Sequence, residues 1–288
     1  MELILNELSL DGQFTSVQSF MDSLSPMIKL QKIIESTNVV MLRHHELYNR
    51  KVTLNITLHH VLTDNSVKTS NEIRVFKRLL QKLMSDDPFW TYAPKHSKAD
   101  SYYFEYLMGL TSGNALAEAC ERDKVILSFE HEHFKMDTVE VLKNGTPVVL
   151  INVTNPIILS NLLWENKLIV NARDYCVYRY DETNLSFQML EQEHGFEQLE
   201  LEEIKAFLSS FDSFIQLSWD DILIHDGLQY KPYSPSRQQD DWFRNSVHRE
   251  KTISKFRTSQ KYRCYGYREN NIFHVIRFER DHRRSDHG

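Results

Sequence analysis

The sequence predicts a mixed α/β or α+β fold, with a larger N-terminal α/β body and a small C-terminal module built on an antiparallel β-hairpin. In residues 1–226, amphipathic helical patterns alternate with short apolar runs typical of strands. The chain then ends in two aromatic-rich runs with two-residue alternation. Between the N-terminal body and the C-terminal module, residues 227–241 hold two prolines, serines and charges without apolar periodicity. They are predicted to be a linker. The C-terminal module is therefore residues 242–288.

The first third of the chain contains two helical patterns. Apolar residues at helical spacing predict a helix over residues 16–36, broken or kinked at Pro26. A second, amphipathic helix is predicted over residues 70–85, ending ahead of Pro88. Three apolar runs favour strands, namely residues 3–10, 38–47 and 52–60.

The middle of the chain combines a helix–strand unit with a hairpin. Residues 115–122 are predicted to be a short helix, followed by a buried strand over residues 124–129. The Asn144–Gly145 pair marks a tight turn between two apolar runs, which predicts a hairpin. The further predictions are helices over residues 156–166 and 198–214 and a strand over residues 175–180.

The C-terminal hairpin is predicted from residues 261–267 and 272–278, joined by a turn whose Asn pair tolerates positive φ. Alternation places Arg263, Tyr265, Tyr267, His274 and Ile276 on one face, and Tyr262, Cys264, Gly266, Phe273 and Val275 on the other. The second face is more apolar and is expected to pack inward. The first face would then present Lys261, Arg263, Tyr265 and His274 to solvent or to a ligand.

Composition indicates a folded protein without a membrane span. The chain has 288 residues, of which 41% are hydrophobic and 26% charged, so its bulk is not expected to be disordered. No apolar run approaches the roughly 20 residues that cross a bilayer. The N-terminus carries acidic residues where a signal peptide carries basic ones, and the three cysteines lie far apart. We therefore expect a reduced, cytoplasmic protein.

Charge is distributed unevenly along the chain. Residues 249–284 contain eleven Lys or Arg and four acids, a local charge of +7. Because the whole chain has a net charge of −6, the remainder carries −13. This asymmetry is typical of a chain end that contacts a polyanion or an acidic partner. The alternative is that the basic end pairs with acids of its own chain.

The basic hairpin predicts contact with nucleic acid. Exposed cations neutralise phosphates, and interleaved aromatic rings stack on unpaired bases. The residues assigned to this contact are Lys255, Arg257, Lys261, Tyr265, Arg268 and Arg280. A histidine can also move a proton at a ribose 2′-hydroxyl while arginine stabilises the developing phosphate charge. The candidate catalytic residues are Arg263, His274, Arg277 and His282.

The last forty residues also show a resemblance to a known family. The strand KYRCYGYR, a turn, an apolar strand and the terminal group FERDHRR together resemble the C-terminal sheet of RelE/ParE-type bacterial toxins. This resemblance implies a compact antiparallel sheet, ribosome-associated mRNA cleavage or another toxic activity, and a cognate antitoxin. Its matched residues are Arg263, Arg277 and His282. A nuclease of bacterial toxin or phage-defence type is the function it implies.

Two other functions remain open. Acids near strand ends, above all Glu118 and Glu130, could hold Mg²⁺ for phosphodiester hydrolysis, as in a PIN-like nuclease. Only this alternative requires a metal. No motif in the sequence indicates another cofactor. In EHEHF, His131 and His133 lack an identifiable third ligand. The remaining alternative is a non-enzymatic subunit that binds other proteins in a defence-type complex.

Overall fold

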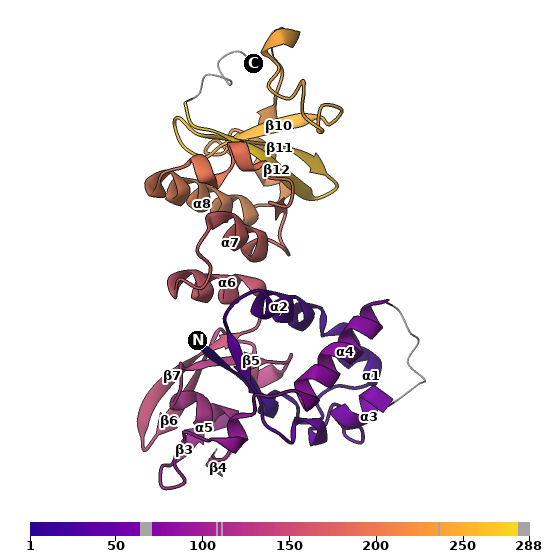
Figure 1. Cartoon of the computed structure of the whole chain (residues 1–288), viewed down its shortest axis with the longest axis vertical. Coiled ribbons are helices and arrows are strands. Elements are labelled where there is room, and N and C mark those ends of the chain that lie inside the picture. The colour runs from indigo at the N-terminus through magenta and orange to yellow at the C-terminus, as the bar shows by residue number, and fades with distance from the viewer. Residues whose placement is uncertain (64–70, 108, 111, 236, 282–288) are drawn as a thin grey trace. The chain divides into compact units, whose positions relative to one another are not determined.

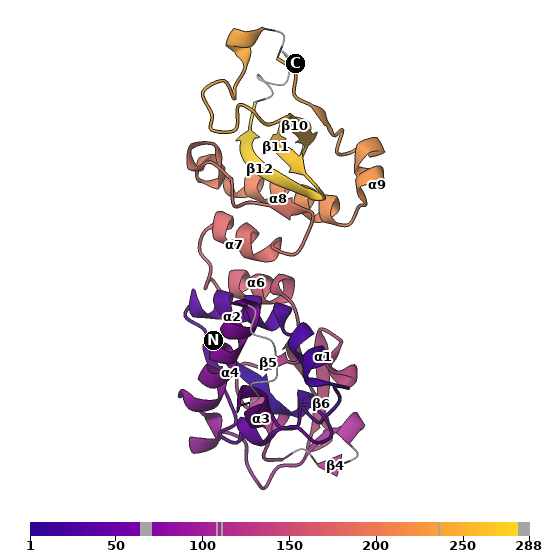
Figure 2. The ribbon, with the colours of Figure 1, turned by 90° about the vertical axis from the view of Figure 1, so that its right-hand side faces the viewer.

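The computed structural model describes residues 1–63, 71–107, 109–110, 112–235 and 237–281. It divides the chain into two compact units, Met1–Leu168 and Ile169–Gly288, which are described separately (Figures 1 and 2). Both units combine helices with a mixed sheet, which confirms the predicted α/β class. The division lies ahead of the predicted linker, so residues 227–241 belong to the second unit.

The sheet of the first unit has the strand order β2-β1-β5-β7-β6-β3-β4. Its first four strands run parallel, and β6, β3 and β4 continue the sheet in antiparallel pairs. The chain moves from β1 to one side to form β2, and returns to the other side of β1 to form β5. The strands are β1 (Glu2–Asn6), β2 (Val40–Leu42), β3 (Tyr102–Phe104), β4 (Gly109–Leu110), β5 (Val125–Ser128), β6 (Thr138–Lys143) and β7 (Thr146–Val153).

Helix α5 (Ala115–Cys120) is fully buried against one face of this sheet (Figure 1). Its core neighbours include Ile4, Ile126, Val141 and Leu150, which come from four different strands. On the opposite face, the side chains of β1 and β5 are also buried. The other helices of this unit are α1 (Val17–Asp22), α2 (Ser25–Glu35), α3 (Leu58–Thr63), α4 (Asn71–Ser85) and α6 (Pro156–Glu165).

The sheet of the second unit has the order β8-β12-β11-β10-β9. Helix α8 covers one face of this sheet (Figure 2). There Phe207, Phe211 and Phe214 contact the rings of Phe256 and Phe278. The elements are α7 (Ala172–Arg179), β8 (Leu185–Ser186), α8 (Leu201–Ile215), α9 (Trp219–Ile224), β9 (Lys231–Pro232), β10 (Ile253–Arg257), β11 (Arg263–Glu269) and β12 (Ile272–Glu279). The predicted C-terminal hairpin is confirmed, and Asn270 in its turn has a φ of 54°.

Three local predictions were wrong. Residues 52–60 are not a strand, because Leu58 and Val61 are buried one turn apart in α3. Residues 175–180 lie largely in helix α7, which Asn171 caps by accepting a hydrogen bond from the Asp174 amide. Of residues 38–47, only Val40–Leu42 form a strand. The predicted interruption at Pro26 is confirmed, since α1 ends at Asp22 and α2 starts beside that proline.

Candidate functional site

The face of the second sheet opposite α8 carries six of the residues that the sequence predicted to act, namely Lys255, Arg257, Arg263, Tyr265, His274 and Arg277. Strand register arranges them in three rows across β10, β11 and β12. These rows are Ile253–Tyr267–His274, Lys255–Tyr265–Arg277 and Arg257–Arg263–Glu279. The two faces of the hairpin therefore have the predicted composition. Their exposure differs from the prediction.

The middle row is covered by Tyr233, from the segment predicted to be a linker, and by Trp242 and Phe243, which directly follow that segment. Tyr265 and Lys255 are fully buried beneath them. Solvent exposure was therefore predicted wrongly for Tyr265, and also for Arg263, which is 8% exposed. A strand face bearing Tyr265 and Ile276 is apolar enough to need a cover of its own.

Arg277 is held by an acidic residue far away in the sequence. Its Nε lies 2.6 Å from Oε2 of Glu191, and its guanidinium also donates to the Trp242 carbonyl. The rings of Trp242 and Phe243 flank the same guanidinium. With 8% of its surface exposed, Arg277 is a buried structural cation in this arrangement.

The third row is also tied internally. Arg263 donates to the carbonyls of Ser259 and Tyr262, and the Tyr265 hydroxyl donates to Glu279 at 2.7 Å. Arg257 donates to the Ser259 carbonyl.

The exposed cations of the hairpin are dispersed. Arg280 pairs with Glu203, while Arg268 stacks over Trp219 on the α8 side of the sheet. Lys261 is exposed, and His282 lies outside the described residues.

The first row ends in a partly open cluster of ionisable groups, which we call the histidine cluster: His248, Lys251, Tyr267 and His274. The His274 ring stacks on the Tyr267 ring, with ring centroids 4.9 Å apart. The centroid of the His248 ring lies 5.8 Å from that of Tyr267. The Lys251 ammonium lies 4.7 Å from the centre of the same tyrosine ring and pairs with Glu269. Two imidazoles and one ammonium therefore surround a single aromatic ring.

The environment of His274 favours its neutral form. Burial lowers the pKa of His274, and the charges of Lys251 and His248 lower it further, against the opposing effect of Glu269. Within the described residues, its Nδ1 has no hydrogen-bond partner. Because Nδ1 is buried, a neutral His274 would accept a proton from a substrate at its other ring nitrogen, Nε2.

The sequence pattern indicated His274 and placed Tyr267 on the same face, but it did not indicate His248 or Lys251. His248 and Lys251 precede β10, and the segment that contains them folds back against Tyr267. Only the pairing of β10 with β11, which places Ile253 opposite Tyr267, indicates that these residues approach each other.

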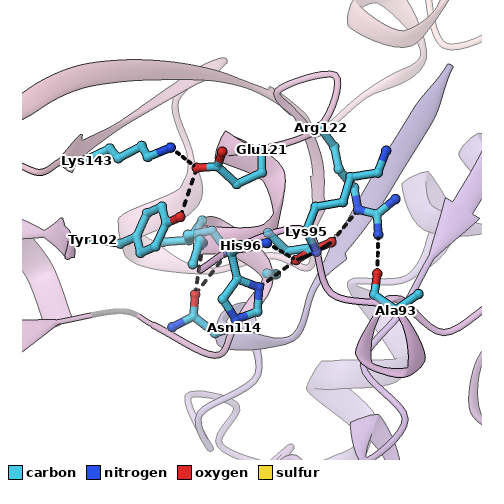
Figure 3. Close-up of polar contacts among 12 residues, drawn as sticks. Ala93, Lys95, His96, Tyr102, Asn114, Glu121, Arg122 and Lys143 are labelled. Carbon is cyan, nitrogen blue, oxygen red and sulfur yellow. Dashed lines mark hydrogen bonds and ion pairs between the residues drawn. The ribbon is translucent and has the colours of Figure 1, made fainter. Parts of the chain in front are cut away.

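The proposed metal ligand Glu118 is a buried structural carboxylate. It accepts hydrogen bonds from the backbone amides of Lys95 and His96, from the His96 ring and from Arg122. Burial opposes its charge, but these donors outweigh burial and lower the pKa of Glu118. Figure 3 shows His96, Lys95 and Arg122 converging beside Tyr102 and Glu121. Little of this carboxylate is left for a metal ion.

The carboxyl ends of the parallel strands carry neutral polar groups. The Asn6 amide donates to the Ser128 hydroxyl at 2.9 Å, which in turn donates to Asn152 at 2.7 Å. Glu130, the second proposed metal ligand, is exposed just beyond β5. No group of three or more potential ligands suited to a metal ion occurs among the described residues. A pocket of about 230 Å³ lies beside this edge, lined by Ser128, Glu130, His131, Lys135 and apolar residues of α2.

Comparison of the chain with protein-family models, with curated proteins and with solved structures finds no match. Among the described residues, no helix has the length and apolar character needed to span a bilayer.

Proposed function

We propose that the chain is a nucleic-acid-directed effector of bacterial toxin or phage-defence type, and that the histidine cluster of its second unit cleaves RNA without a metal ion. The observation that carries this proposal is the position of His274, a partly buried imidazole beside Lys251 and His248. Two imidazoles and an ammonium supply the proton acceptor, the proton donor and the positive charge that this reaction uses.

In the proposed reaction, neutral His274 removes the proton from a ribose 2′-hydroxyl, and the 2′-oxygen attacks the adjacent phosphorus. Lys251 stabilises the charge that develops on the phosphate oxygens, at the expense of its pairing with Glu269. His248 donates a proton to the departing 5′-oxygen. The products are a 2′,3′-cyclic phosphate and a 5′-hydroxyl, and no water is consumed.

This proposal changes the roles first assigned to the buried cations. The sheet that contains β11 and β12 is stabilised by Arg277, Arg263 and Lys255. In this proposal these buried side chains do not contact RNA. Binding of the RNA backbone then depends on exposed cations such as Lys261 and Lys251. A protein partner that restrains the activity, such as an antitoxin, is part of the same proposal, and so is a cytoplasmic location.

The test is an RNA-cleavage assay with the purified full chain in EDTA. His274→Ala should lower kcat/KM by about 100-fold or more, because general acid–base catalysis contributes about that much. His248→Ala and Lys251→Ala should also lower it, while the exposed first-unit variant His59→Ala serves as the matched control.

Two results would contradict the proposal. One is cleavage that survives in His274→Ala. The other is cleavage that requires Mg²⁺ and disappears in Glu118→Gln, which would instead support the PIN-like alternative. Circular dichroism on each variant separates loss of activity from loss of fold.

A further inference from the structure

Among the described residues of the first unit, nothing covers one half of one sheet face. On the face opposite α5, Leu3, Leu5 and Leu127 of β1 and β5 are buried. The corresponding side chains further along the same face are open to solvent: Val149 of β7 is 53% exposed and Tyr103 of β3 is 40% exposed. Parallel strands ordinarily have both faces covered, whereas antiparallel strands such as β6 and β3 can leave one face to solvent, so the residues on this open face decide whether it is a binding surface.

The uncovered half is continuous across three strands. Register places Tyr103 of β3 opposite Leu142 of β6, and Glu140 of β6 opposite Val149 of β7. Tyr106 and Met136, which are 55% and 72% exposed, extend the apolar surface at the end of β6. Beside β3 and β6 the surface is hollowed into a groove of about 640 Å³, whose lining includes Tyr103, Tyr106, Met136 and Leu142.

The groove is acidic as well as apolar. Glu105, Glu132 and Glu140 line it and are exposed, and the other ionisable groups among its described lining residues are tyrosines and His133. The His133 ring is stacked on Tyr106 at 4.5 Å. Aromatic and Met side chains surrounded by charge of one sign are typical of a surface that binds another protein.

We propose that this acidic groove binds an amphipathic helix of a partner protein whose Lys or Arg residues flank an apolar stripe. A helix is the element that ordinarily packs on the face of a sheet, and basic flanks would meet Glu105, Glu132 and Glu140. A second copy of this chain is disfavoured, because a symmetric contact would bring six groove carboxylates together. The groove is built from residues of the first unit and the histidine cluster from residues of the second, so this inference does not depend on the proposed function.

The test uses the full chain and a fluorescent helical probe peptide of about 18 residues, five helical turns, made of Leu, Ala and Lys with the Leu residues on one face. We expect saturable binding, measured by fluorescence anisotropy, that weakens as salt is raised. The triple variant Glu105→Gln, Glu132→Gln and Glu140→Gln should bind about tenfold more weakly. The pair Tyr106→Ala and Met136→Ala should weaken binding without changing its salt dependence.

The matched control removes the same charge elsewhere in the first unit, through Glu46→Gln, Glu130→Gln and Glu165→Gln. Probe binding should be unchanged in this variant, and a scrambled peptide of the same composition should not bind.

Four results would overturn the inference. They are absence of saturable binding, equal binding of the scrambled peptide, equal loss in both triple variants, and sedimentation of the chain as a dimer that the groove variants disrupt. The last would identify a second copy as the occupant. RNA cleavage should be the same in all groove variants.

Discussion

At the scale of single residues, Glu7 is a buried carboxyl whose surroundings oppose its charge. It follows β1 and is fully buried, with one oxygen accepting from the Ala115 amide at 3.0 Å and lying 3.7 Å from Arg50. Its other oxygen has no hydrogen-bond partner within the described residues. Burial raises the pKa of Glu7 to about 7, against the attraction of Arg50.

The raised pKa predicts how stability depends on pH. Between pH 4.5 and about 7, Glu7 keeps its proton in the folded chain but has lost it in the unfolded chain. The stabilisation by this proton is therefore complete below pH 4.5 and is lost as the pH rises through about 7. At about pH 8, Glu7→Gln should therefore be more stable than the natural chain by up to about 3 kcal/mol, and the difference should vanish near pH 4.5. Urea unfolding at several pH values measures this. A difference that is constant with pH would contradict the assignment.

At the scale of elements, the pairing of β11 with β12 depends on Gly266. The two strands slip in register between Tyr265 and Gly266, and a Cβ on Gly266 would lie 2.1 Å from the His274 carbonyl oxygen. The histidine cluster is therefore positioned by a close approach of two backbones that only glycine allows.

This close approach predicts a large effect of one methyl group. Gly266→Ala should cost about 3 kcal/mol of unfolding free energy, because the clash is with backbone and cannot relax by a rotamer change. Gly113→Ala is the control: its Cβ would meet nothing within 4 Å, so only the strain of its positive φ, about 1 kcal/mol, should remain. Equal losses in thermal or urea unfolding would show that Gly266 is not a packing requirement.

At the scale of the whole molecule, charge is balanced within each unit. Residues 1–168 and residues 169–288 each contain 17 Lys or Arg and 20 Asp or Glu, a net charge of −3. The basic end of the chain pairs with acids of its own unit, as in Arg277 with Glu191 and Arg280 with Glu203. The local charge of +7 in residues 249–284 is therefore partly offset by acids of the same unit, as expected if the basic end pairs with acids of its own chain.

Sequence patterns predicted the elements whose signal is local. Helices α4, α6 and α8 have strong apolar or amphipathic patterns, and both hairpins have Asn-containing turns with positive φ. The exposure of Arg277 and Tyr265 could not be predicted in this way. It depends on Glu191 and on Trp242, which lie 86 and 35 residues from Arg277 and approach it only in the folded unit. Proximity of His248 to His274 has the same origin.

We propose that the histidine cluster cleaves RNA with the 2′-hydroxyl of the RNA as the nucleophile. One pair of substrates tests this proposal most directly. An oligoribonucleotide with a single preferred cleavage site is compared with the same strand carrying 2′-deoxyribose at the nucleotide that precedes the scissile bond. We predict cleavage of the first in EDTA, with a 2′,3′-cyclic phosphate at the new end, and none at that position of the second. Equal cleavage of both strands would contradict the account, because the nucleophile would then not be the 2′-oxygen.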